Sequence, residues 1–163
     1  MVEIDIRTGR KDDAEEVSQL LGATWRETYK DMYSADKIAE LTARWHNTDA
    51  LAAEMDDPQS LFLVAVLTGK IAGHLLASQQ EAKTVMLRRL YVLPQTQGRG
   101  LGKSLLNHMI TNFPVARSIK LEVEPENTPA LQFYQTHGFK EIGRTNCCGD
   151  DSDIPALILE KTL

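Results

Sequence analysis

The chain lacks most of the features that mark secreted, membrane or disulfide-stabilised proteins. Its 163 residues contain only two cysteines, and because Cys147 and Cys148 are adjacent they provide no useful disulfide framework. No apolar run approaches the ~20 residues of a membrane helix. The N-terminal residues M-V-E-I-D-I-R hold no apolar core of a signal peptide. We therefore expect a cytoplasmic protein that does not associate with membranes.

The chain also lacks an excess of basic charge and an arrangement of metal ligands. Its 18 basic and 23 acidic residues give a net charge of −5, which disfavours DNA or RNA, since affinity for nucleic acids comes from neutralised phosphates. An acidic balance mildly favours cationic partners. The four histidines show no metal-ligand or catalytic-triad spacing, so we expect no metal and assign them to the core or the surface: His46, His74, His108 and His137.

The remaining composition is that of one globular domain covering residues 1–163. Hydrophobic residues make up 42% of the chain and charged residues 25%, and no repeat, linker or low-complexity tract interrupts it. The order of apolar patterns predicts an α+β fold, in which helices pack on a mixed sheet.

The N-terminal third predicts a short strand and two helices. Residues 4–7 alternate as in a strand, and Asp12 with Glu15 forms a capping pair for the first helix. Ser34 is expected to cap the second helix. Tryptophans Trp25 and Trp45 are assigned to the core, whereas Tyr29 and Tyr33 are candidates for lining an acceptor pocket. Residues 46–58 are expected to form a helix end and a loop.

The middle of the chain predicts three consecutive antiparallel strands. The apolar run 61–67, the turn 68–70 and the run 71–78 form a hairpin, and residues 84–93 form the next strand. After a helix, residues 118–124 alternate as a strand that should lie parallel to 84–93. A helix from Thr128 to Gly138 and strands 139–145 and 154–161 complete the pattern, with an acidic loop, 147–153, between the last two strands.

The most informative stretch is L-Y-V-L-P-Q-T-Q-G-R-G-L-G-K, residues 90–103, which reads as strand, glycine-rich turn and helix. The start of a helix leaves backbone N–H groups unpaired and carries partial positive charge. Glycines at 98, 100 and 102 allow an anion to approach that backbone closely, and Arg99 and Lys103 add cations. A phosphate or pyrophosphate is the natural ligand of such a turn.

Spacing separates this turn from two other phosphate-binding loops. The P-loop needs G-x-x-x-x-G-K-[ST], but its first glycine falls on Gln97. The dinucleotide fingerprint needs G-x-G-x-x-G, but its third glycine falls on Lys103. The pattern that fits without a gap is Q-x-x-G-x-G, formed by Gln97, Gly100 and Gly102. A glycine-rich turn that only begins a helix is the alternative interpretation.

Two motifs resemble the GNAT superfamily of acyl-CoA-dependent N-acetyltransferases. The Q-x-x-G-x-G turn resembles its acetyl-CoA pyrophosphate loop. A second pattern, N-x-x-A-x-x-F-Y-x-x-x-G-F over residues 127–139, resembles the family's following helix at the expected distance. The resemblance covers about residues 61–139. It implies a mixed, mostly antiparallel sheet flanked by about four helices, with a splayed parallel pair formed by residues 84–93 and 118–124.

The resemblance also implies how acetyl-CoA would be held between the splayed strands. Backbone groups of Leu90, Tyr91 and Val92 would pair with the pantetheine arm. Asn127 would hydrogen-bond that arm, although it can also act only as a helix cap, and Phe133 would pack near the adenine or the arm. The pyrophosphate would lie on backbone amides of the turn, whose residues are Gln97, Gly98, Arg99, Gly100, Leu101, Gly102 and Lys103.

Acetyl transfer to an amine needs a base, a hydrogen-bond donor to the thioester oxygen, and an acid. Glu122 is the first candidate for the base and Glu124 the second, on the polar face of their strand; a solvated carboxylate without a role is the alternative. By resemblance, the Val92 N–H would donate to the thioester oxygen. Tyr134 occupies the family's position for the acid that protonates the CoA thiolate, and packing against Phe139 is its alternative role.

The sequence specifies the acceptor less closely than any other part of the reaction. Carboxylates at 122, 124 and 126 and the acidic loop 149–153 suit a cationic small amine, a polyamine or a protein amine. The segment L-E-V-x-x-x-N, residues 121–127, is similar to that of members that acetylate protein N-termini. The resemblance is compatible with a homodimer. A non-catalytic acyl-CoA-binding module and a nucleotide-phosphate enzyme are the alternative functions.

Overall fold

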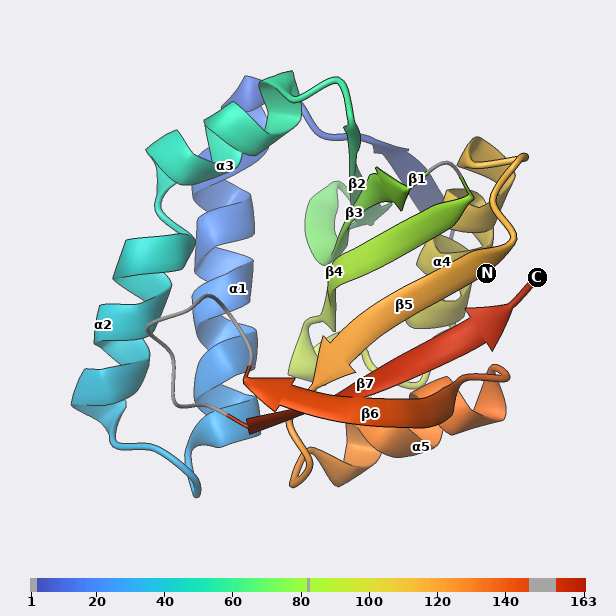
Figure 1. The fold of residues 1–163 in the computed structure, drawn as a ribbon. Helices are drawn as coiled ribbons and strands as arrows, with labels where there is room; N and C mark the ends of the chain where they lie inside the picture. Colours follow the sequence, from blue (N-terminus) through green and yellow to red (C-terminus); the bar gives the residue numbers. More distant parts are fainter. Residues whose placement is uncertain (1–2, 82, 147–154) are drawn as a thin grey trace. The chain divides into compact units, whose positions relative to one another are not determined.

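The computed structural model describes residues 3–81, 83–146 and 155–163, and the chain forms two compact units. Unit 1 comprises Met1–Ala77 and Arg89–Asn112, and unit 2 comprises Ser78–Arg88 and Phe113–Leu163. Within these ranges, seven strands form one sheet in the order β1-β2-β3-β4-β5-β7-β6 (Figure 1). Strands β3 (Lys70–Glu81) and β4 (Thr84–Val92) each run through both units. The sheet holds both parallel and antiparallel pairs, which confirms the expected mixed sheet.

Unit 1 contains the N-terminal helices, a hairpin and the helix that follows β4. Strand β1 pairs antiparallel with β2, from Ile4 opposite Leu67 to Thr8 opposite Leu63. Besides parts of β3 and β4, its elements are β1 (Ile4–Thr8), η1 (Lys11–Asp13), α1 (Ala14–Tyr29), α2 (Ala35–Trp45), α3 (Thr48–Asp56), β2 (Ser60–Leu67), η2 (Pro94–Thr96) and α4 (Leu101–Asn112).

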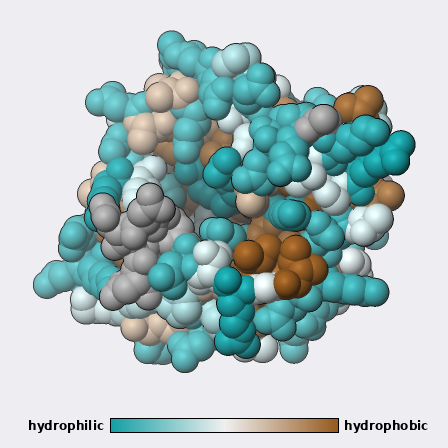
Figure 2. Space-filling view, in the orientation of Figure 1, coloured by the Kyte–Doolittle hydropathy of each residue, from teal (hydrophilic) through white to brown (hydrophobic). Residues whose placement is uncertain are grey.

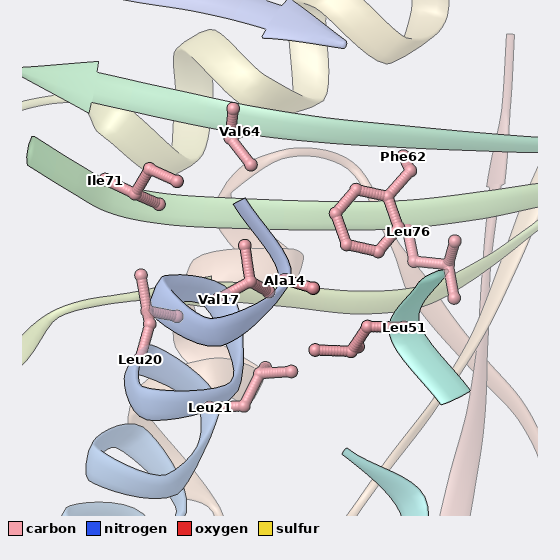
Figure 3. Packing of buried hydrophobic residues seen from close by; sticks show 9 residues of the cluster. All are labelled: Ala14, Val17, Leu20, Leu21, Leu51, Phe62, Val64, Ile71 and Leu76. Carbon is pink, nitrogen blue, oxygen red and sulfur yellow. The ribbon is translucent and has the colours of Figure 1, made fainter. Parts of the chain in front are cut away.

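The core of unit 1 lies between α1 and the β2–β3 hairpin. Figure 3 shows the α1 side chains pointing toward those of β2, β3 and α3. Burial of such a cluster is the main favourable term for folding, at about 25 cal/mol for each Å² of apolar surface removed from water. The labelled residues are Ala14, Val17, Leu20, Leu21, Leu51, Phe62, Val64, Ile71 and Leu76.

Two local expectations for the N-terminal region need correction. Asp13, rather than Asp12, makes the capping interaction at the start of the helical segment: its carboxylate accepts the Arg10 N–H at 2.7 Å. The same carboxylate also accepts two hydrogen bonds from the Arg7 guanidinium, at 2.8 and 3.1 Å. Within residues 46–58 the chain forms a separate helix, α3 (Thr48–Asp56), where only a helix end and a loop were expected. Asn47 caps it by accepting the Ala50 N–H at 2.8 Å. The expected cap of α2 at Ser34 is confirmed.

Unit 2 contains the parallel pair and the C-terminal strands. Strand β4 pairs parallel with β5, from Thr84 opposite Ser118 to Leu87 opposite Leu121, and β4 from Arg89 onward belongs to unit 1. Strand β7 lies antiparallel between β5 and β6. Besides parts of β3 and β4, the described elements of unit 2 are β5 (Ser118–Val123), α5 (Thr128–Thr136), β6 (Lys140–Asn146) and β7 (Pro155–Thr162).

Polar side chains dominate the face of the molecule seen in Figure 2, with smaller hydrophobic patches among them. The large hydrophobic residues most exposed in the structure are Val115, Ile142 and Leu163. No helix within the described ranges is both long and apolar enough to cross a membrane.

Candidate functional site

The glycine-rich turn before α4 has a backbone that side chains would disturb. Gly98 and Gly100 have φ angles of 84° and 82°, in the left-handed region that favours glycine. A Cβ built on either residue would have no protein atom within 4 Å apart from those of its own chain neighbours. The space beside both residues is therefore open to a ligand that approaches the main chain.

The first turn of α4 presents a row of backbone donors. Its first helical hydrogen bond runs from the Ser104 N–H to the Gly100 oxygen at 3.0 Å. The N–H groups of residues 101–103 therefore have no acceptor within the helix. Buried Leu101 anchors this turn, whereas Arg99 and Lys103 are exposed beside it. Such donors, with the positive end of the helix dipole, suit a phosphate or pyrophosphate.

The last residues of β4 divide their backbone groups between two edges. The Leu93 N–H donates to the Ala72 oxygen of β3 at 2.8 Å, and the Tyr91 oxygen lies against Gly73. Because neighbouring residues of a strand point their N–H and C=O groups to opposite sides, those of Leu90 and Val92 face the other edge. At that edge the Gln97 side chain donates to the Val92 oxygen at 3.4 Å.

Tyr91 therefore differs from its two neighbours in the predicted pantetheine-binding segment. Its side chain packs against the core cluster of unit 1, and burial raises the pKa of its phenol. Its backbone groups face β3. The structure thus leaves Leu90 and Val92 as the residues whose main chain can pair with an extended ligand.

Glu122 and Glu124 lie in different environments. Glu122, on β5, is exposed, yet surrounding atoms desolvate its carboxylate enough to raise the pKa, while the charge of Arg88 acts to lower it. Glu124 follows the end of β5 and is only 7% exposed. A carboxylate with a raised pKa that solvent can reach is the better arrangement for a general base.

Helix α5 carries the residues of the second motif. Asn127 caps it, since its Oδ1 accepts the Ala130 N–H at 3.3 Å, and among the described residues its Nδ2 donates no hydrogen bond. The Tyr134 ring is 8% exposed and packs edge-on against Phe133 and Phe139, with ring centroids 5.3 and 5.4 Å apart. The chain leaves the helix at Gly138, whose φ of 91° suits glycine.

The two units carry different groups of predicted site residues. Residues 90–92 and 97–103, whose backbone groups would hold the ligand, belong to unit 1. Glu122, Asn127, Phe133 and Tyr134, whose side chains would act, belong to unit 2. The acidic loop 149–153 that was considered for the acceptor, like the two cysteines, lies outside the described residues.

Sequence reasoning missed a buried polar network in unit 1. Arg89 donates through both terminal nitrogens to Glu54 of α3, one of them at 3.1 Å, and through Nε to His74 Nε2 at 3.3 Å. His74 Nδ1 in turn donates to the Leu63 oxygen at 2.9 Å, so His74 is neutral, and burial holds its pKa well below the usual value. Two adjacent arginines within an otherwise apolar strand were the sequence feature that could have indicated this network.

Arg88, the residue before, was missed as well. It is exposed, and its Nε donates to the hydroxyl of Ser78 at 2.7 Å. Ser78 itself is buried. Strand alternation places Arg88 and Arg89 on opposite faces of β4, and the sequence pattern assigned a role to neither of them.

The aromatic residues of α1 and α2 form a cluster in unit 1. Trp25 and Tyr29 are buried, Trp45 is partly buried, and Trp25 lies 5.8 Å from the ring of His46. Burial lowers the pKa of His46 to about 3. Tyr33 is partly exposed, with Lys37 Nζ 5.0 Å above its ring. Tyr33 is thus partly exposed to solvent, whereas Tyr29 is a core residue.

The groups present fit coenzyme A, and the structure holds no cluster suited to a metal in its described part. An open glycine turn, a row of free amides and two cations match a diphosphate, and a strand edge at Leu90 and Val92 matches an extended amide-containing arm. No three His, Cys, Asp or Glu side chains among the described residues lie close enough together to bind a metal ion.

Comparisons with known proteins identify the family. A model of the acetyltransferase (GNAT) domain matches residues 29–151. The spermidine N(1)-acetyltransferase of Thermoplasma acidophilum is 28% identical over 168 residues, covering 97% of this chain and 96% of that protein. The peptidyl-lysine N-acetyltransferase YiaC of Escherichia coli is 32% identical over 92 residues, 56% of each chain.

A solved structure shows the same fold. The PaiA N-acetyltransferase of Thermoplasma acidophilum, in complex with coenzyme A, has a TM-score of 0.85 and 24% identity, and the match covers 99% of each chain. The family model spans well over half of the sequence and includes the glycine turn, β5 and α5. The chain therefore belongs to the GNAT acetyltransferase family and is an acetyl-CoA-dependent N-acetyltransferase.

Proposed function

We propose that the enzyme transfers the acetyl group of acetyl-CoA to a primary amine by direct attack within a ternary complex. The observation that carries the proposal is the open glycine turn, with left-handed Gly98 and Gly100, leading into the free amides of α4. That arrangement suits a diphosphate and leaves the reactive end of the molecule to other residues. The proposed single domain spans both units, as does the match of 99% of the chain to one solved structure.

Binding would use mainly backbone groups. Amides of residues 98–103 would hold the diphosphate, with Arg99 and Lys103 adding charge. Leu90 and Val92 would pair with the pantetheine arm through the edge of β4 that faces away from β3. Asn127 would donate to the arm through Nδ2 while Oδ1 caps α5, and Phe133 would pack against the arm or the adenine.

Glu122 would make the acceptor nucleophilic. A lysine-type ammonium has a pKa near 10.4, so only about one in a thousand is neutral near physiological pH. A carboxylate beside the amine can take its proton, directly or through a water molecule. Glu122 suits this role because it is accessible and because desolvation raises its pKa toward the working range. Glu124 is the second candidate.

Val92 and Tyr134 would stabilise the remaining charge changes. The Val92 N–H would donate to the thioester oxygen, and losing one such donor typically costs about 3 kcal/mol. Tyr134 would give its phenolic proton to the departing thiolate, since a phenol of pKa ~10 can protonate a thiolate within hydrogen-bond reach. Packing by Phe133 and Phe139 would hold the ring in place.

The acceptor is a cationic small amine or polyamine, or a protein amine. The net charge of −5 and the carboxylates of Glu122, Glu124 and Glu126 favour a cation. The similar proteins include a spermidine and a peptidyl-lysine acetyltransferase. A cytoplasmic location and a homodimer remain predictions.

The proposal is tested by measuring the release of free CoA thiol with a panel of polyamines, peptides and aminoglycosides. At least one amine should stimulate release, and Glu122→Gln and Tyr134→Phe should each abolish most of it. Glu141→Gln, an exposed carboxylate on β6, is the matched control and should leave the rate unchanged. Binding of acetyl-CoA without thiol release for any amine would contradict the proposal.

A further inference from the structure

Arg88 is a cation held in place with most of its hydrogen-bonding capacity unused. Its Nε donates to the buried hydroxyl of Ser78 at 2.7 Å. Neither terminal nitrogen of the guanidinium has an acceptor, and no carboxylate forms an ion pair with it, within the residues that the structure describes. A planar guanidinium with free donors is suited to binding an oxygen atom of a ligand.

Arg88 lies next to the proposed base on the same face of the sheet. The parallel register ends with Leu87 opposite Leu121, and Arg88 and Glu122 are the residues that directly follow this last pair on β4 and β5. Leu87 and Leu121 are buried, whereas Arg88 and Glu122 are exposed on the other face. Strands that are still paired lie about 4.8 Å apart, so one residue beyond the last pair the long side chains of Arg88 and Glu122 can both reach one small group.

Besides Glu124, which follows β5 and is buried, few charges of the described residues lie near this pair. On the far side of Glu122, β7 places the apolar Ile158. The nearest cation along β5 is Lys120, which pairs with Glu160 of β7 at 3.9 Å. Desolvation raises the pKa of Glu122, and the positive charge of Arg88 opposes that rise, in keeping with the short separation of the two groups.

A carboxylate beside a guanidinium matches an amine with an oxygen atom close by. In a peptide N-terminus the carbonyl oxygen of the first residue is three bonds from the α-amine nitrogen. A polyamine or a lysine side chain has only methylene groups at that distance. The pair can therefore bind both polar atoms of an α-amine, but only one of an alkylamine.

Ionisation favours the same acceptor. The guanidinium beside Glu122 disfavours the arrival of a second cation. A peptide α-amine has a pKa of about 7.7–8.0, so about a tenth is already neutral at pH 7, against fewer than one in a thousand for a lysine side chain. The presence of Arg88 thus penalises an alkylammonium more than an α-amine.

We propose that Arg88 binds the acceptor by donating to the first carbonyl oxygen of a peptide, which makes an N-terminal α-amine the preferred acceptor. The inference rests on the proposed function, with Glu122 as the base. Ser78 holds the guanidinium through Nε and leaves both terminal nitrogens for the acceptor.

Three acceptors and three variants test the proposal. The acceptors are a lysine-free peptide with a free N-terminus, the same peptide with a blocked N-terminus and one lysine, and spermidine. The variants are Arg88→Gln, Arg88→Lys and the control Lys120→Gln. Arg88→Gln should lower kcat/KM for the α-amine peptide by about tenfold to a hundredfold, as expected for a hydrogen bond from a charged group, and change the other two acceptors by less than about threefold.

The ratio of kcat/KM between acceptors is the decisive readout, because a general loss of structure would lower all three together. Arg88→Lys should retain part of the preference, and Lys120→Gln should retain all of it. An unchanged ratio in Arg88→Gln would overturn the inference, as would a wild-type preference for spermidine or the lysine peptide. The proposed function fails separately, if no amine releases thiol from acetyl-CoA.

Discussion

Arg88 and Arg89 are consecutive residues of β4 that differ in exposure and in how many of their donors are bonded, and the chain passes from unit 2 to unit 1 between them. The Arg89 side chain is 9% exposed, and its nitrogens are taken by Glu54 and His74. Arg88 is exposed and uses only Nε, on Ser78. The comparison teaches that residue type alone does not define a functional cation: what matters is how many donors the protein has already used.

The same contrast extends to the two units. Unit 1 would bind coenzyme A through main-chain groups, so adding a side chain to its glycine turn should be more harmful than removing one. Unit 2 would carry out the chemistry through side chains, so removing a single hydroxyl or carboxylate should be enough to stop turnover. Each prediction below perturbs one side of this contrast.

The largest effect is expected from Tyr134→Phe in unit 2. Removal of the phenolic proton should lower kcat by about a hundredfold to ten-thousandfold, as is typical of a lost general acid. The ring would keep its packing against Phe133 and Phe139, so acetyl-CoA affinity measured by calorimetry should not change. Equal turnover in the two proteins would remove Tyr134 from the acid role.

Gly100→Val tests the main-chain side of the contrast in unit 1. A valine there would occupy the space beside the free amides and would strain a backbone with a φ of 82°, so acetyl-CoA affinity should fall about a hundredfold. Gly69→Val is the matched control, because Gly69 has a φ of 81° and equally open surroundings in the β2–β3 turn. Unchanged affinity in Gly100→Val, or an equal loss in Gly69→Val, would refute the assignment of the turn.

Glu54→Gln tests the difference between the two arginines through stability. It leaves the Arg89 guanidinium buried without its carboxylate, which should lower the free energy of unfolding by about 3 kcal/mol. Arg88→Gln should lower it by only about 1 kcal/mol, because Arg88 is exposed and the main loss is its one hydrogen bond to the buried hydroxyl of Ser78. Urea unfolding measures both. Similar losses in the two variants would mean that Arg88 is as structural as Arg89.

A smaller effect is expected from pH, with opposite signs in the two units. His46 is buried neutral with a pKa of about 3, so the unfolded state takes up protons first, and stability should fall as the pH drops from 6.5 toward 3. The raised pKa of Glu122 acts the other way, with its contribution lost as the pH rises above 4.5.

Urea unfolding at pH 4.5 and 7 separates these contributions. The wild type should be less stable at pH 4.5, and His46→Phe should reduce that difference, whereas Glu122→Gln should increase it slightly. If His46→Phe loses as much stability between pH 7 and pH 4.5 as the wild type does, His46 does not titrate as a buried neutral group.

Local patterns were sufficient to predict the elements that form the site. Turn chemistry at Gly98 and Gly100 and the capping of α5 near Asn127 are short-range features, and the parallel pairing of β4 with β5 followed from the strand–helix–strand order. Helix α3 was missed because the cap at Asn47 was not recognised.

Long-range partners could not be predicted in the same way. The Arg89–Glu54 pair joins residues 35 positions apart, and nothing local relates them. Likewise, the alternation of β4 indicates that Arg88 and Arg89 diverge, but which of them is buried depends on α3 packing onto one face. The sequence therefore located the backbone that would hold coenzyme A better than the charged side chains around it.

The most direct test of the central claim is amide hydrogen exchange with and without saturating coenzyme A. Exchange should slow at residues 98–103 and at Leu90 and Val92, whose amides would hold the diphosphate and the arm. Tyr91, whose amide faces β3, should change little. Coenzyme A that binds tightly while exchange at 98–103 stays the same would contradict the account.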